Sequence, residues 1–118
     1  IGIKSDLHHI FPRHVLKKAG MTRSQYNQVA NLAVCQSEIN LAIGTKEPKV
    51  YLGQMKRQCT GGPPAYGNIS ALDELHKNLR QHCVPLDEDL WTVDRYADFL
   101  EERRRLMAAL MRRYFDSL

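Results

Sequence analysis

Two adjacent histidines near the start of the chain, His8 and His9 in DLHHIFP, have side chains suited to acid-base or metal chemistry. An imidazole has an unperturbed pKa of about 6.5, so it can exchange a proton at neutral pH, and its neutral form binds metals. Two asparagines follow, Asn31 and, nine residues later, Asn40. An asparagine amide can donate and accept hydrogen bonds or offer its oxygen to a cation. These residue types suit an active-site corner if the chain brings them together.

The elements around these residues are predicted to run strand, strand, helix. Residues 1–7 suit a short strand that ends at the histidines, and VANLAVC (29–35) suits a second strand. SEINLAIG (37–44) has helical spacing and a terminal glycine, so Asn40 is expected on a short helix. Adjacent strand residues point to opposite faces, so a regular strand could not send both histidines to one site. We therefore expect a turn at the strand end, which Pro12 helps to enforce, to divide the histidines between two roles.

Helical patterns account for most of the remaining chain. The predicted helices are Arg13 to Lys18, a turn or two in MTRSQYNQ (21–28), PKVYLGQMKRQC (48–59), NISALDELHKNLRQHC (68–83) and residue 94 to about 115. The last is the longest, and we expect its Met and aromatic residues to face the core. The predicted fold class is therefore α+β and mostly helical, with a hairpin-helix core at about residues 3–46 and a helical extension at about 47–118 of one domain.

Composition limits the class of protein. The 118 residues are 43% hydrophobic and 25% charged, typical of a globular domain, and no apolar run approaches the roughly 20 residues of a membrane span. The net charge of +4 is compatible with a polyanionic partner but is weak evidence alone. The three cysteines are odd in number and form no C-x-x-C pair, which favours free thiols in a reducing cytoplasm. The first residue is Ile, so we expect a domain cut from a longer chain.

The order His, Asn, Asn in DLHHIFP and NLAVCQSEIN resembles the signature of HNH (ββα-metal) nucleases. More narrowly, HHIFP, ANLAVCQSEINLAIGTKEPKVYL and YADFLEERRRLMAAL look like the C-terminal nuclease domain of GmrSD-type modification-dependent restriction enzymes and related phage-defence proteins. The motifs cover about residues 4–57, and a looser helical similarity covers most of the rest. The resemblance implies a metal-dependent DNA endonuclease that hydrolyses phosphodiester bonds in restriction or antiviral defence.

The resemblance also implies a role for each motif residue. His9 takes the position of the general base, and Asn31 that of the asparagine holding its loop. His8 and Asn40 take the positions of the metal ligands. Two neutral ligands favour a loosely held Mg²⁺ or Mn²⁺, with Ni²⁺ as an in vitro substitute. Many HNH proteins bind a structural zinc through cysteine pairs, but Cys35 has no such neighbour, so no structural zinc is expected.

Partners follow from the same resemblance. Double-stranded DNA is the implied substrate, and Lys46, Arg13 and Lys49 are the expected phosphate contacts, with Lys46 foremost. Sensing and nucleotide use in the wider family belong to an N-terminal domain, so we expect a sensor or NTPase-like domain in the same longer protein. A homodimer would explain double-strand cutting, although nothing in the sequence demands one. No membrane partner is expected.

Less specific interpretations remain open. The chief alternative is a non-catalytic DNA-binding or interaction module that retains the HNH fold, and a weaker one is a helical regulatory domain whose histidines bind structural zinc. His14, His76 and His82 have no matching partners and are expected at the surface or in packing. The arginine runs at 103–105 and 112–113 are expected on a solvated helix face or at a domain contact rather than on DNA.

Overall fold

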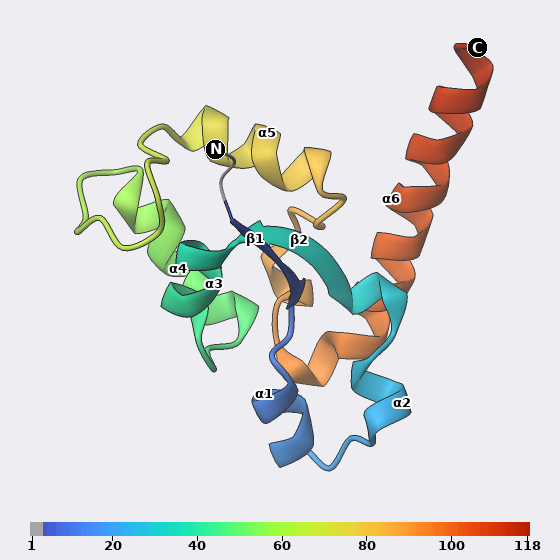
Figure 1. Cartoon of the computed structure of the whole chain (residues 1–118), viewed down its shortest axis with the longest axis horizontal. Coiled ribbons are helices and arrows are strands. Elements are labelled where there is room, and N and C mark those ends of the chain that lie inside the picture. Colours follow the sequence, from blue (N-terminus) through green and yellow to red (C-terminus); the bar gives the residue numbers. More distant parts are fainter. Residues whose placement is uncertain (1–3) are drawn as a thin grey trace.

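The computed structural model describes residues 4–118, apart from the side chains of residues 37 and 38. It is a small α+β domain in which helices surround a two-stranded antiparallel sheet (Figure 1). The elements in chain order, with η for a 3₁₀ helix, are β1 (Ser5–His9), α1 (Arg13–Lys18), α2 (Arg23–Tyr26), η1 (Val29–Asn31), β2 (Leu32–Gln36), α3 (Ser37–Ile43), α4 (Pro48–Gln58), α5 (Leu72–Gln81), η2 (Glu88–Leu90), η3 (Val93–Arg95) and α6 (Tyr96–Asp116).

The predicted order of strand, strand and short helix is confirmed. Strand β2 begins only at Leu32, because residues 29–31 form the turn of η1 instead of the predicted start of the strand. Helix α3 follows β2 without a loop and packs against both strands. It ends at Gly44, whose φ of 56° lies in the region that favours glycine. Asn40 therefore lies on a helix held directly against the hairpin.

The register of the hairpin decides which side chains share a face. Asp6 is opposite Cys35 and His8 is opposite Ala33, whereas Leu7 is opposite Val34 on the other face. His8 is 7% exposed, but Leu7 is 66% exposed. His8 and His9 are the last two residues of β1, as predicted, but both belong to the regular strand. The expectation of a turn at the histidines is therefore wrong. Strand alternation sends the two side chains to opposite faces.

An aromatic core supports the turn that follows β1. The ring centroid of Phe11 lies 5.1 Å from that of Tyr96 and 5.0 Å from that of Phe99, both in edge-to-face geometry. Phe11 and Phe99 are fully buried, and Trp91 is nearly so. Such rings contribute both buried apolar area and geometric preference. The first turns of α6 thus pack against the segment that leaves the histidines.

The second half of α6 departs from the sequence prediction. The last turns of the helix project away from the rest of the described chain (Figure 1). Leu110, Met111 and Tyr114 are 45%, 60% and 62% exposed, so the predicted core stripe covers only the first half of the helix. The helical pattern reports one apolar face, but it does not report where the neighbouring elements end.

No helix in residues 4–118 combines the length and apolar character needed to cross a membrane. The cysteines Cys35, Cys59 and Cys83 are free thiols, in agreement with the prediction from their number and spacing.

Candidate active site

The packing of α3 on the hairpin brings His8 and Asn40 into contact. Nδ1 of His8 lies 2.9 Å from Oδ1 of Asn40, although 32 residues separate them in the chain. An amide oxygen only accepts, so in this contact Nδ1 of the neutral imidazole carries the proton and donates it to Oδ1. Nδ1 gains a lone pair only if this proton moves to Nε2. The pair could then offer one nitrogen and one oxygen to a cation.

The surroundings of His8 favour its neutral form. Burial lowers the pKa of His8, and the charges of His9 and Arg103 lower it further, while the hydrogen bond with Asn40 opposes the shift. Burial is the largest of these effects because it disfavours the charged imidazolium. Since the ordinary pKa of histidine is about 6.5, His8 is neutral at neutral pH. A neutral imidazole is the form that binds a metal ion.

The distance between the two atoms is also compatible with a small octahedral cation. Neighbouring ligands in an octahedral Mg²⁺ or Mn²⁺ site at about 2.1 Å from the ion lie about 3.0 Å from each other. The 2.9 Å between His8 Nδ1 and Asn40 Oδ1 is close to that value, but in this structure it is the length of a hydrogen bond, so both groups would have to turn toward an ion. No group of three His, Cys, Asp or Glu side chains in the described part of the chain is arranged to hold a metal ion. Two protein donors would leave the other positions of such an ion to water or substrate.

Asp6 extends this cluster and was missed by the sequence analysis. Its Oδ2 accepts a hydrogen bond of 3.3 Å from Nδ2 of Asn40. Asp6 and His8 are two residues apart on β1, so strand alternation places them on one face; this spacing in the sequence could have identified Asp6.

Opposite Asp6, burial and the Asp6 charge raise the pKa of the Cys35 thiol. Because the thiolate is the metal-binding form, Cys35 is a poor ligand at neutral pH.

His9 lies on the other face of β1 and does not join the His8 contact. Its Nε2 lies 2.8 Å from Oδ1 of Asn27, the residue that follows α2, and its ring meets Tyr26 edge-on at 6.2 Å. An amide oxygen only accepts, so Nε2 carries the proton and the lone pair is on Nδ1. Asn27 was not identified from the sequence because its distance of 18 residues from His9 gives no local pattern.

Asn31 is fully buried beneath the segment that follows His9. Its Oδ1 accepts a hydrogen bond of 2.8 Å from Phe11 N–H. Its Nδ2 donates to Phe11 O at 3.1 Å and to Tyr26 O at 3.0 Å. The backbone oxygen of Asn31 accepts a further bond from Ile10 N–H at 2.8 Å. One side chain thus joins the turn after β1 to the end of α2, the two segments that carry His9 and Asn27.

Tyr51 of α4 supports the same turn from the other side. Its hydroxyl donates to Ile10 O at 2.6 Å, and its ring meets that of His8 edge-on at 6.1 Å. Burial raises the pKa of Tyr51, so the hydroxyl keeps its proton and remains a donor. Nothing local in the sequence predicts this contact, because it joins residues 41 positions apart.

Arg103 corrects an expectation about the arginine run of α6. Its side chain is only 4% exposed and donates to four backbone oxygens, at 3.4 Å to Val29, 3.0 Å to Ala30, 2.7 Å to Leu32 and 3.1 Å to His82. Burial lowers the pKa of Arg103. The expected solvated face is found for its neighbours, since Arg104 and Arg105 pair with glutamates one turn earlier. Arg103 is therefore a buried residue that holds the start of β2, and it does not belong to the solvated face.

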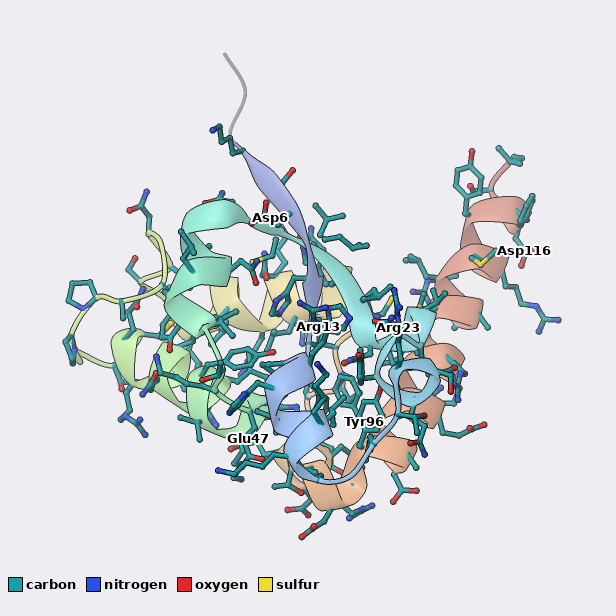
Figure 2. All side chains as sticks on the ribbon, turned by 60° about the horizontal axis from the view of Figure 1, so that its bottom comes forward. Asp6, Arg13, Arg23, Glu47, Tyr96 and Asp116 are labelled. Carbon is teal, nitrogen blue, oxygen red and sulfur yellow. The ribbon has the colours of Figure 1, made fainter. Side chains whose placement is uncertain are left out.

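The predicted phosphate-binding residues occupy three separate places. Lys46, exposed just after α3, donates from Nζ to Ala42 O at 3.0 Å. Lys49 lies 3.7 Å from a carboxylate oxygen of Glu88, which also pairs with Lys56. Arg13 is exposed at the start of α1, toward the opposite end of β1 from Asp6 (Figure 2). Of the three, Lys46 is the nearest in sequence to Asn40, and Arg13 is the nearest to His8.

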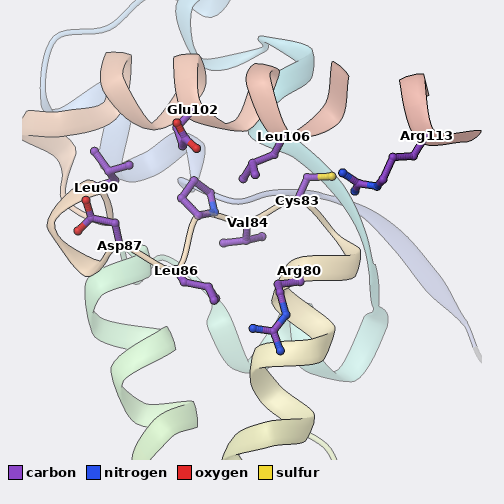
Figure 3. A pocket seen from close by; sticks show the side chains of 10 residues that line it. Arg80, Cys83, Val84, Leu86, Asp87, Leu90, Glu102, Leu106 and Arg113 are labelled. Carbon is purple, nitrogen blue, oxygen red and sulfur yellow. The ribbon is translucent and has the colours of Figure 1, made fainter. Parts of the chain in front are cut away.

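The structure has one cavity beside His8 and another beside α6. One of about 520 Å³ opens beside His8, between the hairpin, α4 and α5, with Tyr51, Tyr66 and Asn78 in its lining. Another of about 540 Å³ lies between α6 and the segment after α5, with Cys83, Leu90 and Leu106 among its lining residues (Figure 3). Of the two, the first is lined by His8 but not by Asn40.

No protein-family model matches the chain, and no match was found among curated proteins or solved structures. The function is therefore inferred from the residues of this chain and their arrangement.

Proposed function

We propose that this chain is a metal-dependent endonuclease domain of HNH type that hydrolyses phosphodiester bonds in double-stranded DNA. One observation carries the proposal: a hairpin followed directly by a helix holds His8 Nδ1 and Asn40 Oδ1 2.9 Å apart. His9 lies on the opposite face of β1 with its Nε2 against Asn27, which leaves its Nδ1 available to accept a proton. For His9 to act on a phosphate held at His8 and Asn40, the proposal requires the end of β1 to turn when DNA binds. Metal-dependent phosphodiester hydrolysis requires groups that bind a cation, here His8 and Asn40, and a general base, here His9.

The proposed base is His9. Asn27 accepts the proton of Nε2 in a hydrogen bond and so keeps the lone pair of the ring on Nδ1. Nδ1 takes a proton from a water molecule as the water oxygen bonds to phosphorus, and the bond from phosphorus to the 3′ oxygen of the sugar breaks. Solvent returns a proton to that oxygen. The products are a 3′-hydroxyl and a 5′-phosphate.

The proposed ligands are His8 and Asn40. A divalent ion held there, Mg²⁺ or Mn²⁺, would neutralise the phosphate and stabilise the departing oxygen. Burial keeps the imidazole of His8 neutral near neutral pH, and the ion would bind Nδ1 with the single ring proton on Nε2. Asn31 and Tyr51 hold the turn after His9, so the base is carried on a braced segment.

Exposed cations would hold the DNA backbone. Lys46 is the foremost candidate because it is exposed just after the helix that carries Asn40. Lys49 is a weaker candidate because Glu88 lies beside it. Phosphate contacts of this kind give affinity without sequence information. Target choice in restriction or antiviral defence would then belong to a sensor domain of the same protein, in the cytoplasm.

A plasmid-nicking assay tests the proposal. Supercoiled plasmid is incubated with the wild type, His9→Ala and His14→Ala in Mg²⁺, Mn²⁺ or EDTA. His14 is a matched control because it is an exposed histidine on α1. We expect nicking by the wild type and His14→Ala in either metal, none in EDTA, and at least a 100-fold loss in His9→Ala, the lower end of a general base's contribution. Circular dichroism verifies that each variant is folded.

Equal nicking by His9→Ala would refute the assigned base. Retarded migration of a DNA duplex by a wild type that nicks in no metal would favour the alternative, a non-catalytic DNA-binding module with the same fold.

A further inference from the structure

The contact between Asp6 and Asn40 has a consequence for how the amide of Asn40 is oriented. Oδ2 of Asp6 accepts from Nδ2 of Asn40 at 3.3 Å, while Oδ1 of the same amide lies 2.9 Å from His8 Nδ1. The amide thus lies between a carboxylate and an imidazole, with one end toward each. All three side chains are at least partly buried.

The two ends of an asparagine amide have opposite chemistry. The oxygen accepts hydrogen bonds and can bind a cation, whereas the NH₂ group only donates. Rotation of the amide by 180° would direct two N–H bonds toward His8 and remove the oxygen from the ion. An asparagine ligand therefore needs a neighbour that distinguishes its two ends, and groups behind a metal ligand commonly have this function.

We propose that Asp6 is a positioning residue that orients the Asn40 amide, so that Oδ1 faces His8 Nδ1 and remains available to a divalent ion. An ionised carboxylate only accepts, so it pairs with the NH₂ end and repels the oxygen end. Strand alternation places Asp6 on the same face as His8. The inference deepens the proposed function and rests on it, because it assumes that Asn40 is a metal ligand.

Direct Mn²⁺ binding, measured by the loss of the free-ion electron paramagnetic resonance signal, tests this role without DNA or activity. The wild type, Asp6→Ala, Asn40→Asp and the double variant are titrated with Mn²⁺. A carboxylate at position 40 has two oxygens and therefore no wrong orientation. We expect Asp6→Ala to weaken Mn²⁺ binding about 10- to 100-fold when Asn40 is present. In the Asn40→Asp background we expect a change of less than about threefold.

Asp94→Ala is the matched control, because Asp94 is an exposed aspartate on η3, and its Mn²⁺ affinity is expected to equal that of the wild type. A similar loss from Asp6→Ala in both backgrounds would overturn the orienting role and identify Asp6 as a ligand or a simple charge. An unchanged affinity of Asp6→Ala with Asn40 present would overturn it as well. A wild type that binds no Mn²⁺ would overturn both the inference and the proposed metal site, whereas the first two outcomes leave the proposed function intact.

Discussion

The side chain of Asn31 pairs with both backbone groups of Phe11, in the manner of a strand neighbour. Phe11 N–H donates to Oδ1 at 2.8 Å, and Phe11 O accepts from Nδ2 at 3.1 Å. A third bond joins Nδ2 to Tyr26 O at 3.0 Å. The turn after His9 consequently has its polar groups satisfied in a place that water does not reach, since Asn31 is fully buried.

This arrangement predicts that Asn31 is required for stability. Asn31→Ala removes one acceptor and one donor group that together make three buried hydrogen bonds, so we expect a loss of about 3 kcal/mol in the free energy of unfolding. Asn31→Asp keeps the size but places a carboxylate oxygen against two carbonyls, and we expect at least the same loss. Urea unfolding followed by circular dichroism measures both. The exposed Asn68→Ala is the control, with a change within about 0.5 kcal/mol. A comparable small change in Asn31→Ala would contradict the bracing role.

Arg103 gives a second prediction about the support of the site. Arg103→Met keeps an apolar side chain of similar length but leaves the carbonyls of Ala30, Leu32 and His82 without this donor. We expect a loss of about 3 kcal/mol in the free energy of unfolding. Arg104→Met is the matched control on the same helix, because its pair with Glu101 is exposed and worth less than about 1 kcal/mol. Equal urea midpoints for the two variants would refute the structural role of Arg103.

The lowered pKa of His8 predicts how stability depends on pH. Burial keeps this pKa below the value of about 6.5 expected in the unfolded chain, so the unfolded state binds the proton more readily. The contribution is present above about pH 6.5 and is lost as pH falls through the lower, folded pKa. His8→Gln removes the ionisable group, and its unfolding free energy should decline less than that of the wild type between about pH 7 and pH 5. His14→Gln should follow the wild-type profile; identical slopes in all three proteins would disprove the assignment.

The candidate metal pair predicts stabilisation by Mn²⁺. When the free ion concentration is about 100 times the dissociation constant, binding to the folded state adds about 2.7 kcal/mol to the free energy of unfolding. This is enough to raise the melting temperature by several degrees. Asn40→Leu removes the ligand oxygen at similar size and should abolish this shift. Asn78 is an exposed asparagine on α5, so the control variant Asn78→Leu should retain the shift. EDTA should reverse the shift in the wild type. Equal shifts in wild type and Asn40→Leu would place Mn²⁺ elsewhere.

The surroundings of the lysines predict unequal contributions to DNA binding. Lys46 is exposed beside the turn after α3, whereas Glu88 partly neutralises Lys49. We expect Lys46→Ala to weaken binding of a DNA duplex and to reduce the salt slope of log K by about 1, the value for one phosphate contact. Lys49→Ala should have a smaller effect. Fluorescence anisotropy in EDTA at several salt concentrations measures both, and a larger effect of Lys49→Ala would reverse the assignment.

Most of the element order can be predicted from local patterns in the sequence. Helix α1 has the predicted bounds, α3 and α4 begin at the predicted residues, and the strands differ in their ends. These signals are local: Pro48 precedes a helical pattern, and Gly20 and Gly44 lie where helices end. The strand ends were less predictable because pairing partners decide where a ladder begins and ends. The motif residues His8, His9, Asn31 and Asn40 were found in the same way, from type and spacing.

The contacts that those residues make depend on the tertiary fold. It placed His8 against Asn40 and His9 against Asn27, on opposite faces of one strand. It also added Asp6 to the cluster and buried Arg103, which the sequence had assigned to the surface. These contacts join segments from 18 to more than 70 residues apart. Local periodicity and capping involve residues a few positions apart, so the partners of each side chain depend on how α3, α4 and α6 pack around the hairpin.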